Sequence, residues 1–130
     1  MLTTLLKAKL HRVTVTQACV DYEGSCAIDA ALLDLAGIRE FEQIHLYNLS
    51  NGERLITYAI KAPEHSGVIS VNGAAAHKAA PGDLLIVASY AQYASEELGA
   101  YAPRLLYIDC HNHVIRICNA LDVAASDLAS

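Results

Sequence analysis

Short stretches in which apolar and polar residues alternate recur along most of the chain, separated by turn signals. In the clearest example, Val13 and Val15 alternate with Thr14 and Thr16. Successive side chains of a β-strand point to opposite faces, so this pattern predicts strands with one buried face. The N-terminal residues 1–12 read as the first strand, with clear alternation over 10–16, and further strands are expected over 44–49, 54–60, 68–71, 83–88, 105–108 and 114–117.

Turn and helix signals separate these strands. Asn51-Gly52 between two apolar runs predicts a hairpin with a type I′ turn, whose two central residues both need φ > 0. Asp29 is suited to cap a helix over residues 30–36 that ends at Gly37, and a second short helix is expected around 95–98. Many short strands with one or two short helices predict a mainly β fold that closes, or nearly closes, into a barrel.

The composition fits a single domain and excludes some partners. The chain has 130 residues, 54% of them hydrophobic and 18% charged, which suffices for one core. A formal net charge of −5 and the lack of a basic run argue against nucleic-acid binding. No apolar stretch has the length of a membrane span, so we expect a cytoplasmic protein with reduced cysteines and no membrane contact. Residues 119–130 are rich in Ala, Ser and Asp and are expected to be loosely ordered.

A cysteine- and histidine-containing segment near the C-terminus is the one cluster that looks like a metal site. It contains Cys110, His111, His113 and Cys118. Zinc sites usually use wider, loop-borne pairs such as Cys-x-x-Cys, which this segment lacks. We interpret it as a polar turn between two small thiols and expect no metal.

Two further local patterns suggest chemistry. Ser25 or Cys26 with His11 would form a hydrolase dyad, although no nucleophile-elbow spacing supports it. The small residues 73–76 that follow Asn72 would let backbone N–H groups approach a small anionic ligand closely. Neither pattern is specific by itself.

Four separated segments form a more specific signal when they are taken in order. They are Lys9-Leu10-His11-Arg12-Val13 with Asp21–Asp29, Asn51–Arg54 with Thr57–Ile60, Ser70–His77, and Pro81-Gly82-Asp83. Together they resemble the pyruvoyl-dependent aspartate 1-decarboxylases. The resemblance covers roughly residues 1 to 118, and collinear agreement of separate motifs makes chance similarity improbable. Tyr47 departs from the pattern, because members of this family usually carry Trp at that position.

The resemblance implies a fold, a cofactor and an activity. It implies a double-psi β-barrel that assembles as a homotetramer, and a precursor that cuts itself between Gly24 and Ser25 into residues 1–24 and 25–130. Ser25 would become a covalent pyruvoyl group. Through a Schiff base to that group, the enzyme would convert L-aspartate to β-alanine and CO₂ for pantothenate biosynthesis.

The resemblance also implies roles for single residues. Ser25 would attack the carbonyl of Gly24, Thr57 would donate a hydrogen bond to the resulting oxyanion, and Tyr58 would return a proton to carbon after CO₂ has left. Aspartate carries two carboxylates, which calls for fixed cations. The candidates for substrate binding are Lys9, Arg54, Thr57 and the backbone at Gly73, Ala74 and Ala75, with His11, Tyr22 and Asn72 in support.

Other functions stay open at this point. One alternative is a non-catalytic double-psi barrel that serves as a binding or assembly module. Another is a pyruvoyl decarboxylase that acts on a different amino acid. Taken singly, Lys9 and Arg54 are as well explained as solvated charges, and Tyr58 as an amphipathic residue at the edge of the core.

Overall fold

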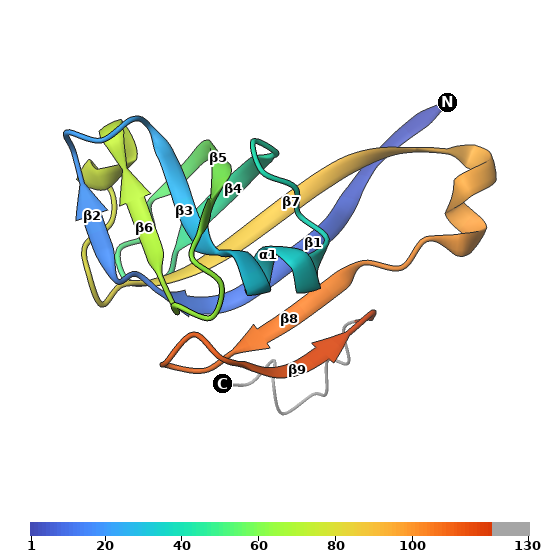
Figure 1. Cartoon of the computed structure of the whole chain (residues 1–130). Coiled ribbons are helices and arrows are strands. Elements are labelled where there is room, and N and C mark those ends of the chain that lie inside the picture. The colour runs from blue at the N-terminus through green and yellow to red at the C-terminus, as the bar shows by residue number, and fades with distance from the viewer. Residues whose placement is uncertain (121–130) are drawn as a thin grey trace.

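The computed structural model describes residues 1–120 and shows a mainly β single domain (Figure 1). The predicted loose ordering of residues 119–130 falls almost entirely outside this range. The elements are β1 (Leu2–Thr14), β2 (Gln17–Cys19), β3 (Ser25–Asp29), α1 (Ala30–Ala36), β4 (Gln43–Asn48), β5 (Arg54–Ala62), β6 (Ile69–Asn72), the 3₁₀ turn η1 (Gly73–His77), β7 (Leu84–Ala94), the 3₁₀ turn η2 (Ser95–Ala100), β8 (Arg104–Ile108) and β9 (Val114–Cys118).

All the strands belong to one nine-stranded sheet, in the order β2-β6-β3-β5-β4-β7-β1-β8-β9. Three of its pairs are parallel, namely β3 with β5, β2 with β6, and β1 with β8. A parallel pair needs a crossover connection and cannot be made by a tight hairpin. This interleaved order fits the double-psi β-barrel that the family resemblance implies. The predicted mainly β fold with short helices is confirmed.

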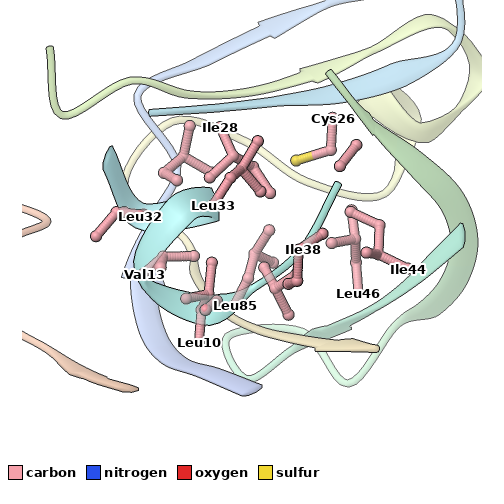
Figure 2. Close-up of a cluster of buried hydrophobic side chains, with 14 of the residues drawn as sticks. Leu10, Val13, Cys26, Ile28, Leu32, Leu33, Ile38, Ile44, Leu46 and Leu85 are labelled. Atoms are coloured by element: carbon pink, nitrogen blue, oxygen red, sulfur yellow. The ribbon is translucent and has the colours of Figure 1, made fainter. Parts of the chain in front are cut away.

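The core is aliphatic and follows the alternation of the strands. In β1, Ala8 and Leu10 are fully buried, whereas Lys9 between them is only partly buried. The helix α1 adds Leu32 and Leu33 to the same cluster (Figure 2). The buried cluster holds no aromatic ring within residues 1–120. The interior of the barrel is therefore packed mainly with Val, Ile, Leu and Ala side chains, as expected for a chain with 6% aromatic residues.

The helix α1 begins and ends where the sequence predicts. The Asp29 side chain accepts a hydrogen bond from the backbone N–H of Ala31 at 2.9 Å, which caps the helix. The same carboxylate accepts from the N–H groups of His65 and Gly67, both at 2.9 Å. Gly37 ends the helix with φ 71°. Asp29 thus joins β3, α1 and the loop before β6.

β7, with 11 residues, is much longer than the predicted strand over 83–88, whereas the 13 residues of β1 agree with the predicted first strand. They pair along their whole length, with irregularities between Leu6 and Ala8 and between His11 and Val13. In Figure 1 the two strands run side by side away from the body of the barrel towards the N-terminus. Residues beyond Ala88 carry little apolar alternation, so the pairing with β1 decides their conformation.

The predicted type I′ turn between β4 and β5 is wrong. Of the two central residues only Gly52 has a positive φ, of 78°, and Asn51 does not. Gly52 N–H donates to the carbonyl of Asn48 at 2.9 Å, and Asn48 N–H donates to the carbonyl of Glu53 at 2.8 Å. The Asn51 side chain accepts from Glu53 N–H and donates to the carbonyl of Lys78, both within 3.0 Å. These side-chain bonds favour a longer loop over the two-residue turn.

Candidate functional site

Ser25 is the first residue of β3, and its hydroxyl is buried and held from two sides. Its Oγ donates to the carbonyl of Glu23 at 3.1 Å and accepts from Nδ2 of Asn72 at 3.2 Å. Oδ1 of Asn72 in turn accepts from the Ser70 hydroxyl at 2.8 Å. The side chain is 1% exposed, whereas Gly24 beside it is exposed. A single hydroxyl is therefore fixed at the backbone segment that the sequence marks for cleavage.

Gly73 lies directly against this segment. The register pairs Ser25 with Asn72, which brings the following residue up to Gly24. A Cβ on Gly73 would lie 2.5 Å from Cα and 2.8 Å from N of Gly24, and Gly73 has φ 67°. Both the contact and the conformation require glycine. The close approach seen at Gly73 is to the chain's own backbone. The predicted approach of residues 73–76 to a small anionic ligand stays a prediction.

Thr57 and Tyr58 reach the same place from β5. The parallel register pairs Cys26 with Ala59, so extending it backwards brings Ser25 and Gly24 alongside Tyr58 and Thr57. The Tyr58 ring lies 6.3 Å from the Phe41 ring, centroid to centroid. An open pocket of about 360 Å³ results at this junction. Its lining residues are Gly24, Leu55, Ile56, Thr57, Tyr58, Asn72, Ala74, Ala75 and Lys78.

A larger hollow, of about 580 Å³, lies elsewhere on the sheet. Tyr22 and Asn72 line it, but Gly24, Thr57 and Tyr58 do not. Its remaining walls come mainly from β2, β5 and the loop that begins at Pro63. We assign the site to the smaller pocket, because the bond expected to be cut lines that one. Tyr22, exposed in the turn before β3, is two residues before Gly24 in sequence but does not line this pocket.

The predicted cations Lys9 and Arg54 do not line this pocket and lie on the outer face of the sheet. Direct pairing places Arg54 opposite Tyr47, Tyr47 opposite Ile86, and Ile86 opposite His11. Side chains of directly opposed residues share a face, so the row runs across β5, β4, β7 and β1 on one side. Lys9 lies on that face too, two residues before His11.

Two basic residues on the outer face, Lys9 and His11, have lowered pKa values. Burial lowers the pKa of Lys9. Burial, followed by the charges of Lys9 and Arg12, lowers the pKa of His11. Nδ1 of His11 is buried and has no hydrogen-bond partner within residues 1–120. A buried polar atom without a hydrogen-bond partner costs folding free energy, and a ligand or a second chain can supply the missing bond.

The buried thiol beside the predicted nucleophile is unreactive. Cys26 is fully buried, and this burial raises its pKa to about 12. A thiol with that pKa stays protonated at neutral pH and is a poor nucleophile. His11 lies on the outer face of β1, where its ring packs 5.3 Å from that of Tyr107. The weak hydrolase-dyad hypothesis therefore finds no support in the structure.

The sequence analysis missed three pocket residues. Leu55 and Ile56 supply apolar walls, and Lys78 contributes a cation whose Nζ lies 2.9 Å from Oε2 of Glu53. Lys78 follows the 3₁₀ turn η1, and no local pattern marks it as facing β5. Within residues 1–120 no group of three or more His, Cys, Asp or Glu could hold a metal ion, and no helix could span a membrane.

Comparison with known proteins shows which family the chain belongs to. The profile described as aspartate decarboxylase matches residues 1–115. The chain belongs to the aspartate decarboxylase family. Family members include the aspartate 1-decarboxylase of Nitrosococcus oceani, 57% identical over 95% of this chain and 98% of that one. That of Methylobacillus flagellatus is 60% identical over 85% of this chain and 88% of its own length.

Among solved structures, the rationally designed mkDPBB_sym_86 protein matches 59% of this chain and 90% of its own, with 13% identity and a TM-score of 0.45. The residues that match the aspartate decarboxylase family, 1–115, include every segment that carries the resemblance. The resemblance is confirmed as to family. The pocket that holds Gly24, Thr57, Tyr58, Asn72, Ala74 and Ala75 is therefore the site on which the family's chemistry is to be tested.

Proposed function

We propose that this chain decarboxylates L-aspartate to β-alanine and CO₂ after cutting its own backbone before Ser25. Membership of the aspartate decarboxylase family makes it a carboxy-lyase acting on aspartate, with β-alanine serving pantothenate synthesis. The observation that carries the self-cutting step is the buried Ser25 hydroxyl, fixed by Glu23 and Asn72 at the wall of an open pocket. Four free cysteines support a cytoplasmic setting.

The cleavage follows from the position of the Ser25 hydroxyl. Its Oγ attacks the carbonyl carbon of Gly24, the peptide C–N bond breaks, and an ester replaces the amide. Gly24 leaves this carbonyl unshielded, since no side chain covers it. Thr57, on the same pocket wall, donates to the oxyanion that forms on Gly24. Elimination of the ester releases residues 1–24, and water then displaces ammonia to leave a pyruvoyl group on residue 25.

The residues of the pocket fit the chemistry of that group. A pyruvoyl group there would supply a carbonyl for the substrate amine and a sink for the electron pair that the departing CO₂ leaves behind. Tyr58 lines the pocket, and its phenol supplies the proton to carbon after CO₂ has left. Gly73 approaches Gly24 closely and Ala74 and Ala75 line the pocket, so this backbone would orient the bound substrate.

We further propose that a homotetramer completes the site. Lys9, His11 and Arg54 share the outer face, but none of them lines the pocket at Gly24. Arg54 and His11 are three strand spacings apart, about 14 Å. The outer face of one copy against the pocket of the next would bring cations to the substrate carboxylates and a partner to Nδ1 of His11.

The expected result for maturation is two fragments in an intact-mass measurement under denaturing conditions. These are residues 1–24 and residues 25–130, the second blocked at its N-terminus by the pyruvoyl carbonyl. Borohydride should add hydrogen to the second fragment alone. The same preparation should release CO₂ and β-alanine from aspartate, and should release no CO₂ from glutamate or lysine. A chain that stays whole and keeps a free amine after prolonged warming contradicts the proposal.

Thr57 and Tyr58 are neighbours for which we expect different defects. Thr57→Val keeps the shape but removes the donor to the oxyanion, so cleavage should slow by roughly a hundred- to a thousandfold. Tyr58→Phe should cleave at the parental rate and bind aspartate, but release CO₂ far more slowly. The measurement is a cleavage time course on denaturing gels beside CO₂ release per cleaved chain.

Thr16→Val is a control for the removal of a threonine hydroxyl outside the pocket. Within residues 1–120 the Thr16 hydroxyl bonds only to the backbone of Ile69, so this variant should lose stability without losing cleavage. The assignment of the two roles is reversed if Tyr58→Phe fails to cleave while cleaved Thr57→Val loses only decarboxylation.

A further inference from the structure

The guanidinium of Arg54 rests on an aromatic ring instead of a carboxylate. Its central carbon lies 4.3 Å from the centroid of the Tyr47 ring. Within residues 1–120 Arg54 forms no ion pair. A guanidinium stacked on a ring face keeps its N–H donors around the edge, and these are the donors that bind a carboxylate with two bonds. The orientation of the Tyr47 ring therefore sets the orientation of the proposed substrate cation.

The Tyr47 ring is itself held by a second tyrosine. The hydroxyl oxygens of Tyr47 and Tyr90 lie 2.8 Å apart, and either can donate. His45 packs edge-on against both rings, at 5.0 Å from Tyr90 and 6.0 Å from Tyr47. β4 and β7 are neighbours with His45 opposite Ala88, so the contact joins adjacent strands and needs no flexible loop.

The Tyr90 hydroxyl stays uncharged. The bond from Tyr47, followed by burial, raises the pKa of Tyr90 to about 12, and the nearby charge of Arg54 opposes this only in part. Both the bond and the burial favour the neutral Tyr90 phenol, so no Tyr90 phenolate competes for the guanidinium at neutral pH. Arg54 keeps its charge available for an external carboxylate.

We propose that Tyr90 is a positioning residue for substrate binding, acting through the Tyr47 hydroxyl to hold the Arg54 guanidinium ready for a carboxylate of aspartate. This rests on the proposed role of Arg54. A Trp at position 47 would need no partner at position 90, because an indole lacks a hydroxyl at that tip and presents a larger face to the guanidinium. A tyrosine has a smaller face and is held at its tip.

The test is the kinetics of Tyr90→Phe, which removes one oxygen and keeps the ring. We expect KM for aspartate to rise roughly three- to tenfold, the effect of one neutral hydrogen bond, with kcat per cleaved chain nearly unchanged. Tyr47→Phe breaks the same bond from the other end and should show the same split. The double variant should be no worse than either single one.

Two matched variants separate positioning from general packing. Tyr93→Phe changes another β7 tyrosine, whose ring packs on Tyr101 at 5.1 Å, and should leave KM as in the parent. Tyr47→Trp added to Tyr90→Phe should restore KM, because the indole face holds Arg54 without a hydroxyl partner.

The possible outcomes are distinct. An unchanged KM in both single variants, a loss confined to kcat, or additive effects in the double variant overturns the positioning role while leaving the decarboxylase function intact. A parent that never releases β-alanine instead overturns the proposed function. If Tyr90→Phe fails to fold, Tyr47→Phe alone decides the question.

Discussion

Ser25→Ala should leave the chain uncut and abolish release of β-alanine. Alanine keeps the backbone of β3 and removes the only atom expected to attack Gly24. Cys26 cannot replace it, because burial raises the thiol pKa to about 12. The substitution also leaves Nδ2 of Asn72 without its bond to Oγ, which costs about 1–3 kcal/mol of folding free energy. The measurements are intact mass, β-alanine production and thermal unfolding.

Ser66→Ala is the control for loss of a serine hydroxyl. In the part of the chain that the structure describes, its Oγ accepts only from the N–H of Val68 in an exposed loop, so cleavage and activity should match the parent. If Ser25→Ala still produced β-alanine from aspartate, the pyruvoyl assignment would be wrong. If it stayed folded and uncut, the attacking group is the Ser25 hydroxyl.

Gly73→Ala should slow self-cleavage about a hundredfold or more. The added Cβ would lie 2.5 Å from Cα of Gly24, where carbon atoms normally stay about 3.5–4.0 Å apart. The segment that must be cut is therefore pushed away, and a displacement of about 1 Å at a reacting group costs on the order of a hundredfold in rate. The cleavage time course of the purified precursor measures this.

Gly52→Ala separates this contact from ordinary backbone strain. Gly52 has φ 78°, close to the 67° of Gly73, but a Cβ there meets nothing within 4 Å. Both variants should lose about 1–2 kcal/mol of folding free energy from the left-handed conformation. Only Gly73→Ala should lose cleavage. Equal cleavage rates in the two variants would show that the approach to Gly24 does not matter for processing.

Local physical rules predicted much of the fold. Alternation located most of the strands, because burial of one face requires it wherever a strand lies on the core. Asp29 and Gly37 fixed α1, since a cap and a terminator act within a few residues. Local patterns gave a wrong prediction where contacts with other residues decided the conformation. Asn51 bonds to Glu53 and Lys78, which stabilises a loop that the dipeptide alone would not form.

The sequence by itself determined the family, through collinear motifs, and with it the candidate residues and the predicted cut between Gly24 and Ser25. Only the tertiary structure decided which of these residues meet. Parallel pairing of β3 with β5 and close approach of Gly73 bring Gly24, Thr57 and Tyr58 to one pocket. The register across β5, β4, β7 and β1 places Arg54 and Lys9 on the outer face, and neither of them lines that pocket. Pairing between distant strands depends on hydrogen bonds and packing summed over the whole barrel, and no local pattern encodes that sum.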